Sequence, residues 1–329
     1  MGTFDISAAV YFLRRRMPLG WMAQKVARCL PGSSASFGPP RRSCSNPEYA
    51  RRSGAEWIVS VPSYRPTYTP PVIFGSQAPD YGPALAREMP DAGVLRLKDA
   101  RVFTPQGWVV GEDDHYLPDN SWFGWETRPF GLSIYARARL GPLTHVRGTN
   151  LNLTSEFATG NYAHLVLDGL SRLHLFLATG MDVASLDHVL VPTRTYPILG
   201  RFLSRFGIPK AKVIAANEAA HVRCDKLWAP SFPGRRRNTP YWVVDFWRDG
   251  FRSETERPPL RRLYISRRGH RRSILNEADI KPILDRRGFE EIRGDVDPSV
   301  FAEAAVVVGG FGAGLADIIT AAREQRSWN

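Results

Sequence analysis

The sequence is poor in cysteine and has no long apolar run. Its three cysteines, Cys29, Cys44 and Cys224, lie far apart among 329 residues and form no CxxC pair. This spacing argues against a disulfide framework and against a structural zinc site, and it favours a reducing compartment such as the cytosol. No apolar stretch approaches the roughly 18 residues that a transmembrane helix needs. The residue order of a secretory signal peptide is missing as well.

Acidic residues are too few to balance the basic ones. The 44 Lys and Arg exceed the 32 Asp and Glu, which gives a formal net charge of +12. Such a charge favours an anionic partner: nucleic acid, a membrane surface or a phosphorylated substrate. No RNA- or DNA-recognition motif is present, which argues against nucleic acid. Residues 1–30 form a basic amphipathic stretch, either a peripheral contact with the inner membrane surface or a helix that stays with the protein body.

The composition and the hydrophobic pattern of the chain change near residue 91. Residues 1–90 are rich in proline and in Gly-Ser clusters, and we interpret them as irregular with one strand at Trp57–Val61. From there a strand–helix–strand rhythm predicts parallel sheets with crossover helices. A basic, proline-flanked stretch at 230–240 resembles an interdomain linker. We therefore predict an α/β protein with domains at 91–232 and 238–329.

Several elements can be predicted within this rhythm. Strands are expected at 187–191 and 212–215, with a helix at 198–206 between them. A further helix is expected from Asn276 to Gly288. Asn276 with an acidic residue three positions later resembles a capping box, and Gly288 has the place of a C-terminal glycine.

A glycine-rich turn lies near the C-terminus. The apolar run Ala305–Val308 predicts a fully buried strand, and Gly309–Gly314 then opens a last helix. Backbone N–H groups at a helix N-terminus attract phosphate, and glycines allow an anion to approach closely. The alternative is a tight turn with no ligand. The segment is not a dinucleotide fingerprint, because its third glycine position is Leu315.

Arginines gather after the strand predicted at 262–266. A parallel strand delivers the residues that follow it to the edge of the sheet where ligands bind. Guanidinium groups suit diphosphate oxygens, so Arg267 and Arg272 are predicted to bind the ligand. Arg268 and Arg271 are interpreted as solvated surface residues.

A histidine and an aspartate are spaced for a shared helix face. His164 and Asp168 lie one turn apart in the helix predicted at 161–178. A carboxylate orients an imidazole and raises its basicity, so the pair suits general-base catalysis. The alternative is a pair that only ties this helix to a neighbour.

Two acidic segments are candidate metal sites. Asp295 and Asp297 match a DxD pattern, and the run 112–115 combines three acidic residues with His115. Short acidic matches are frequent by chance. We therefore interpret both as solvated loops and predict no metal site.

Together these segments resemble glycosyltransferase family 61, whose bacterial members are often described as capsular polysaccharide biosynthesis proteins. The resemblance covers about residues 94–322. It rests on Asn161-Tyr162-x-His164 with Asp168 and Arg172-Leu173, on Tyr264-Ile-Ser-Arg267 with Arg272 to Glu277, and on Gly312-Ala-Gly-Leu315.

The resemblance implies a GT-B-like architecture, with an acceptor-side Rossmann-like domain followed by a nucleotide-sugar domain. It also implies an inverting, metal-independent hexosyl or pentosyl transfer from a nucleotide sugar to a glycan acceptor, with no cofactor. The catalytic roles would belong to His164 and Asp168. The donor-binding roles would belong to Arg267, Arg272, Asn276, Gly312, Ala313, Gly314 and Asp317.

The sequence departs from the family pattern near its end. Phe311 stands where the family commonly has histidine, and Asp317 stands where asparagine is usual. Family members also continue beyond the last helix, whereas this chain stops at Asn329. We therefore expect the second domain to be truncated. The alternative function is a non-catalytic relative that binds a nucleotide or polyanion.

Overall fold

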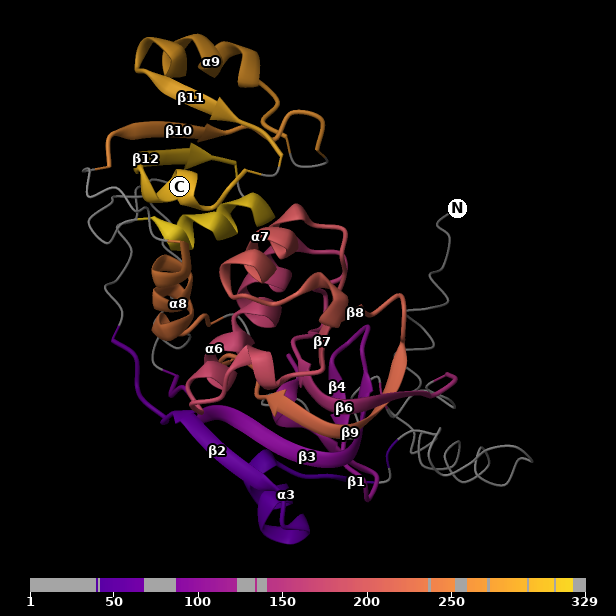
Figure 1. Cartoon of the computed structure of the whole chain (residues 1–329). Coiled ribbons are helices and arrows are strands. Elements are labelled where there is room, and N and C mark those ends of the chain that lie inside the picture. The colour runs from indigo at the N-terminus through magenta and orange to yellow at the C-terminus, as the bar shows by residue number, and fades with distance from the viewer. Residues whose placement is uncertain are drawn as a thin grey trace, which may run out of the picture.

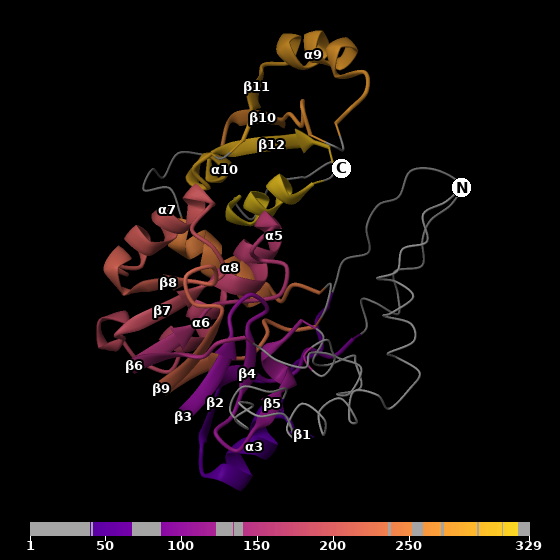
Figure 2. The ribbon, with the colours of Figure 1, turned by 90° about the vertical axis from the view of Figure 1, so that its right-hand side faces the viewer.

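The computed structural model describes residues 40, 42–67, 87–122, 134, 141–235, 238–251, 259–270, 273–294, 296–310 and 312–321. These residues form two sheets with helices between and around them (Figure 1). The larger sheet carries the indigo to orange part of the chain, and the smaller one carries the orange to yellow part. The side view in Figure 2 shows the same succession. Arg272, Asp295, Phe311 and the basic stretch 1–30 lie outside the described residues.

The larger sheet is mixed. Its order is β1-β5-β4-β3-β9-β6-β7-β8, and β2 pairs with β3. Strands β9, β6, β7 and β8 are parallel neighbours, whereas β2, β4 and β9 each run antiparallel to β3. The strands are β1 (Arg42–Ser43), β2 (Glu56–Val61), β3 (Ala92–Phe103), β4 (Trp108–Val110), β5 (His115–Leu117), β6 (Thr144–Asn152), β7 (His188–Val191), β8 (Val213–Ala215) and β9 (His221–Pro230).

Helices cover both faces of this sheet. They are α3 (Asn46–Ser53), the short η1 (Pro118–Asn120), α5 (Tyr162–His164), a π-helical turn η4 (Leu165–Leu170), α6 (Arg172–Leu177), η5 (Val183–Ser185), α7 (Pro197–Arg205), η6 (Lys210–Lys212) and α8 (Tyr241–Phe251). Consecutive residues of β3 point to opposite faces, so Val94 enters the core under α6, α7 and α8, and Leu95 enters the core under α3. The sheet is therefore buried between two apolar layers.

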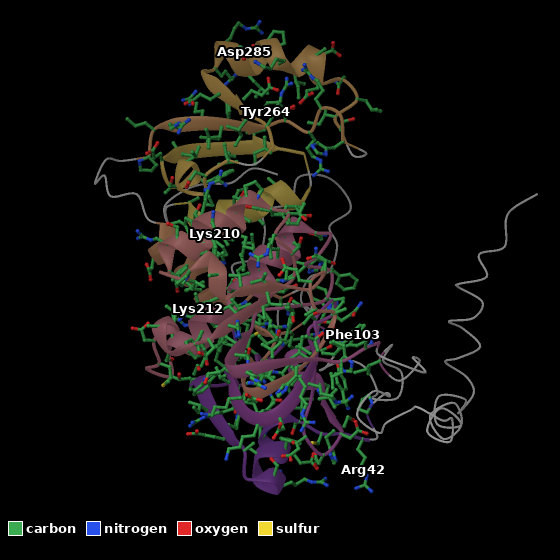
Figure 3. The ribbon with its side chains drawn as sticks, turned by 45° about the vertical axis from the view of Figure 1, so that its right-hand side comes forward. Arg42, Phe103, Lys210, Lys212, Tyr264 and Asp285 are labelled. Atoms are coloured by element: carbon green, nitrogen blue, oxygen red, sulfur yellow. The ribbon has the colours of Figure 1, made fainter. Side chains whose placement is uncertain are left out.

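The smaller sheet is wholly parallel, in the order β11-β10-β12. Its strands are β10 (Arg261–Ile265), β11 (Phe289–Ile292) and β12 (Ala304–Gly309), and its helices are α9 (Glu277–Arg286), α10 (Ser299–Ala302) and the 3₁₀ helix η7 (Ala313–Thr320). Its core is small and includes Leu263, Phe301 and Val307. Figure 3 shows Tyr264 in this sheet and Phe103 in the larger one.

The α/β fold class is confirmed, and so are several elements. The strands predicted at 187–191 and 212–215 are β7 and β8, and the helix predicted between them is α7. Helix α7 starts with Pro197 in its first turn and buries Ile198 and Phe202, which are four residues apart on one face. Local spacing is enough to predict an amphipathic element of this kind. None of the helices in the described ranges has the length and hydrophobicity that a membrane-spanning segment requires.

Two local predictions are wrong. Strand β12 is only partly buried, because it pairs with β10 alone and forms an edge of the described sheet. The Asn276 side chain makes no capping hydrogen bond within the described residues, because its backbone (φ −105°, ψ 37°) is not extended as in a capping residue. Neither difference changes the course of the chain.

The boundary regions also differ in detail from the sequence interpretation. Helix α3 and strand β1 lie within 1–90, where only one strand was expected. Helix α8 follows the stretch interpreted as a linker, yet it packs into the core of the larger sheet through Val243, Phe246 and Trp247. The Trp247 indole N–H also donates to the Ser171 hydroxyl over 2.8 Å. Helix α8 thus belongs structurally with the larger sheet.

Candidate functional site

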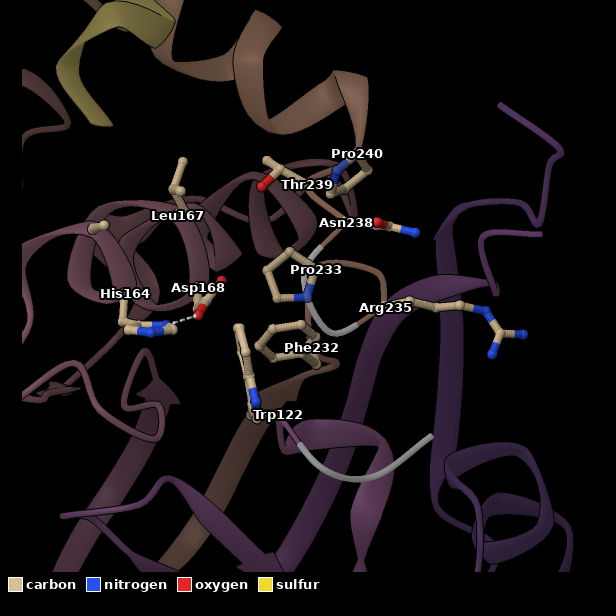
Figure 4. Close-up of a pocket in the computed structure, with 11 residues that line it drawn as sticks. Trp122, His164, Leu167, Asp168, Phe232, Pro233, Arg235, Asn238, Thr239 and Pro240 are labelled. Carbon is tan, nitrogen blue, oxygen red and sulfur yellow. Dashed lines mark hydrogen bonds and ion pairs between the residues drawn. The ribbon is translucent and has the colours of Figure 1, made fainter. Parts of the chain in front are cut away.

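His164 and Asp168 sit where a helix starts above the end of β6. The Asn161 side chain caps this helix by accepting from the Ala163 N–H over 3.0 Å. Gly169 lets the helix approach the strand, since a Cβ at this position would lie 3.0 Å from the Leu153 carbonyl oxygen. His164 Nδ1 lies 2.6 Å from Asp168 Oδ2 (Figure 4). The structure therefore brings the two residues into direct contact.

Asp168 occupies a buried, charged environment. Burial raises the pKa of its carboxyl group, and this effect is opposed by the hydrogen bond from His164 and by the positive charges of His164 and Arg172. Arg172 is completely buried, and burial lowers its pKa to about 10. Its Nε donates to the Asp168 carbonyl over 2.9 Å, and its Nη2 donates to the Asn120 carbonyl over 2.8 Å. The buried Arg172 thus places a positive charge next to Asp168 of the His–Asp pair.

Aromatic rings surround the His164 imidazole. The Trp122 ring centroid lies 4.7 Å from it with the planes at 80°, and the Phe157 centroid lies 5.2 Å away. Phe232 meets the other side of this group, with its centroid 5.5 Å from that of Trp122. Strand β6 separates Trp122 from His164 along the chain, so no local sequence pattern predicts that their rings meet.

A pocket of about 240 Å³ opens beside the pair. Figure 4 shows Trp122 and Phe232 on one side of it, and the Thr239 hydroxyl on the side towards Leu167. The Arg235 guanidinium points away from His164, and its Nε donates to the Glu88 carbonyl. The lining residues are Trp122, Ala163, His164, Leu167, Asp168, Phe232, Pro233, Arg235, Asn238, Thr239 and Pro240. Apolar walls with a few polar groups are typical of small-ligand sites.

The glycine turn and Arg267 meet at the end of the smaller sheet. Gly312 lies directly under the Arg267 guanidinium, because a Cβ on Gly312 would fall 1.1 Å from Arg267 Nη1. Helix η7 begins at the next residue, Ala313, and Gly314 lies in its first turn. Backbone N–H groups and a guanidinium at one sheet edge are suited to a diphosphate.

A buried carboxylate fixes the strand end that carries Arg267. Glu277 accepts from the Tyr264 hydroxyl over 2.7 Å, from the Ser266 hydroxyl over 2.6 Å and from Arg268 Nε over 3.0 Å. These interactions, with Ser266 first, lower the Glu277 pKa to about 2. Arg268 therefore has a partner, contrary to its interpretation as merely solvated. The predicted ligand Asn276 is exposed beside Glu277, at the start of α9.

A hydrogen bond joins the two regions. The Tyr162 hydroxyl, at the start of α5, donates to Asp317 Oδ1 in η7 over 2.6 Å. The two residues are separated by 155 positions, so no local pattern could predict the contact. Asp317 is buried, and its interaction with Tyr162 brings η7 against α5. Helix α5, which ends at His164, and helix η7, which follows the glycine turn, therefore lie next to each other.

The DxD segment has a structural explanation. Asp297 accepts from the Ser299 N–H over 3.0 Å at the start of α10, and it pairs with Arg201 over 3.4 Å. In the other acidic segment, Asp114 pairs with Arg101, and Asp113 lies 2.9 Å from His115. Within the described ranges, no three His, Cys, Asp or Glu side chains gather as they would around a metal ion.

The comparison with protein families decides the relationship. The family model "Glycosyltransferase 61" matches residues 162–326, which is half of the chain. The chain belongs to glycosyltransferase family 61. No curated protein matches it.

Membership of family 61 establishes the general function of the protein, and the matched region shows which candidate site residues belong to the family domain. The protein is a glycosyltransferase, so it acts on a sugar donor and an acceptor. The matched region begins at Tyr162 and contains both His164 and Asp168, as well as Arg267 and the turn at 312–314. Three residues of the candidate site lie before the matched region. Trp122 and Phe157 contact the His164 ring, and Glu156 accepts a hydrogen bond from the Trp122 backbone N–H.

Proposed function

We propose that this family 61 protein transfers a hexosyl or pentosyl group from a nucleotide sugar to a glycan hydroxyl, with inversion, in the synthesis of capsular or cell-surface polysaccharide. The observation that carries this proposal is the Tyr162–Asp317 hydrogen bond, which joins the helix of the candidate base to the helix of the candidate phosphate site. Acceptor activation and leaving-group stabilisation must occur within one site. The contact supports the proposal because it holds the helices that carry these residues side by side.

The proposed reaction is a single displacement. An acceptor hydroxyl oxygen forms a bond to the anomeric carbon while the bond from that carbon to the diphosphate oxygen breaks. Because Nδ1–H of His164 donates to Asp168, Nε2 is the nitrogen that takes the hydroxyl proton. Attack from the face opposite the leaving group inverts the anomeric centre.

The departing diphosphate carries the charge that develops in this reaction. We assign its stabilisation to Arg267, to the N–H groups at Gly312, Ala313 and Gly314, and to Arg272, which lies outside the described residues. Asp317 would act by holding η7 through Tyr162, since its carboxylate already accepts that hydroxyl. Asn276 remains a proposed donor contact.

We also propose a GT-B-like division into two Rossmann-like units, of which the first binds the acceptor and the second binds the nucleotide sugar. The sequence set the units at 91–232 and 238–329. Because α8 packs on the larger sheet, we place the boundary between α8 and β10. The cytosolic face of the inner membrane is the proposed place of action, with the basic stretch 1–30 as the peripheral contact.

Nucleotide-sugar turnover tests the function. The protein is incubated with a panel of nucleotide sugars and glycan acceptors, and the released nucleoside diphosphate and the new glycoside are measured. A thermal shift with nucleoside diphosphates accompanies it, since a ligand at about 100 times its Kd adds about 2.7 kcal/mol of stability. Binding without turnover of any sugar would favour a non-catalytic nucleotide-binding relative.

Metal dependence is tested in the same assay. We expect EDTA to leave turnover unchanged, because the proposed site uses N–H groups and arginine charge. Loss of turnover in EDTA that manganese restores would instead favour a metal role for Asp295 and Asp297.

A further inference from the structure

Phe157 has an unusual backbone conformation beside the candidate base. Its φ is +65°, in the left-handed region that bulky side chains rarely adopt. Its side chain is large and apolar, yet 49% of the residue is exposed. Strained residues persist only where the surrounding structure enforces them, and they cluster at functional sites. The conformation thus calls for a reason other than packing.

Glu156, the residue before Phe157, is held firmly inside the protein. Its carboxylate is buried and accepts from the Trp108 indole N–H over 2.8 Å, the Ser121 hydroxyl over 2.6 Å and the Trp122 backbone N–H over 2.8 Å. Three converging donors hold Glu156 inside the protein. The next residue, Phe157, is half exposed in the turn between β6 and α5.

The same carboxylate also fixes the second ring. The Trp122 backbone N–H donates to the Glu156 carboxylate. The Trp122 ring lies edge-on to both His164 and Phe157, with centroids 4.7 Å and 6.0 Å away. Phe157 and Trp122 therefore both touch the His164 imidazole and are both anchored through one buried group. Trp122 lines the pocket, where the Thr239 hydroxyl and the Asp168 carboxylate offer polar contacts, and Phe157 touches the same imidazole from outside the pocket lining.

We propose that Phe157 and Trp122 form the platform on which a pyranose ring of the glycan acceptor lies, with Glu156 as the positioning residue of both. A pyranose has an apolar face of C–H groups and a rim of hydroxyls. The planes of the two rings stand at 85°, so the half-exposed Phe157 ring takes the apolar face and Trp122 supports it edge-on. A rim hydroxyl reaches His164. The assignment of this sugar as the acceptor rests on the proposed transferase function. The donor contacts lie elsewhere, at Arg267 and the glycine turn.

Sugar binding can be measured without turnover. We expect at least one of the methyl glycosides of glucose, galactose, mannose, N-acetylglucosamine, rhamnose and xylose to bind saturably at concentrations up to about 50 mM, in saturation-transfer NMR and calorimetry. Phe157→Asn should weaken this binding by about tenfold or more. Its melting temperature should stay equal or rise, because asparagine tolerates the left-handed conformation.

Two further variants separate the ring from the fold. Phe157→Tyr keeps an aromatic face and should bind the sugar as the wild type does. Met181→Asn removes another exposed apolar side chain, away from the pocket, and should leave both binding and melting temperature unchanged. A lower melting temperature with unaltered sugar binding in Phe157→Asn would make Phe157 a packing residue and overturn the platform.

Glu156→Gln tests the anchor. The glutamine amide replaces one of the two carboxylate oxygens with an N–H₂ donor, so it cannot accept all three hydrogen bonds. Sugar binding should therefore fall while nucleoside diphosphate binding stays at the wild-type level. Unchanged sugar affinity in this variant refutes the positioning role. If no methyl glycoside binds the wild type, the platform is wrong even where turnover is found. If sugars bind through Phe157 but no nucleotide sugar turns over, the platform stands and the transferase proposal fails.

Discussion

Replacement of Gly312 by alanine should displace Arg267 without unfolding the protein. The new Cβ would lie 1.1 Å from Arg267 Nη1 and 2.3 Å from its Cζ, distances that no structure tolerates. The obstacle is the far end of a flexible side chain, so the guanidinium moves and the backbone stays. Gly312 has an extended backbone (φ 177°, ψ 172°) that alanine adopts without strain.

The magnitude follows from the hydrogen bonds that Arg267 would lose. Hydrogen bonds to charged groups contribute about 1.5–3 kcal/mol. Nucleoside diphosphate affinity should therefore fall about 10- to 150-fold in Gly312→Ala. Arg267→Ala should lose a similar amount. The double variant should bind no more weakly than Arg267→Ala alone, because both changes remove one interaction.

Titration calorimetry with nucleoside diphosphates, together with melting temperatures, measures this cycle. Gly310→Ala is the matched control, since its Cβ would meet nothing closer than 3.5 Å and should leave affinity unchanged. Wild-type affinity in Gly312→Ala would refute the reasoning. Losses that add in the double variant would show that Gly312 and Arg267 act separately, and Arg267 would then not bind the diphosphate through this turn.

Three other changes have expected outcomes. His164→Ala should lower kcat by about 10²–10⁴, and Asp168→Asn should act in the same direction by spoiling the imidazole tautomer; normal turnover by folded variants would end the catalytic role. Burial raises the Asp119 pKa from 3.8 to about 6, so at pH 7.5 Asp119→Asn should stabilise the protein by up to about 3 kcal/mol in urea unfolding, with no gain near pH 3. Burial lowers the His221 pKa from 6.5 to about 4, so protonation of the unfolded state should remove about 3 kcal/mol of stability between pH 7 and pH 4. His221→Gln should lack that part of the slope, and an identical pH profile would contradict the assignment.

The sequence by itself determined the elements and pairs that depend on short spacing. Apolar periodicity was enough to predict β7, α7 and β8, because a helix or strand face is set by residues within one or two turns. The contact between His164 and Asp168 likewise follows from a four-residue interval on one helix. Such features survive in nearly any tertiary arrangement.

The sequence analysis did not predict two central strands of the larger sheet, because their residues do not show a clear local pattern. Strands β6 and β9 carry polar residues such as Asn150, Asn152 and Arg223 among their apolar ones, so neither shows a clear alternation. The Asn150 side chain can be buried because its amide N–H₂ donates hydrogen bonds to the carbonyls of Gly148 and Lys226. The Lys226 carbonyl is in place only once β9 has inserted between β3 and β6.

Tertiary structure alone decided the composition of the candidate site. Glu156 meets Trp108 across 48 residues, and Tyr162 meets Asp317 across 155. Burying a carboxylate is unfavourable unless several donors converge on it, and those donors come from segments that only the folded chain assembles. The sequence therefore encodes which residue types are present and which local elements they form. Desolvation and long-range packing decide which of them meet around His164.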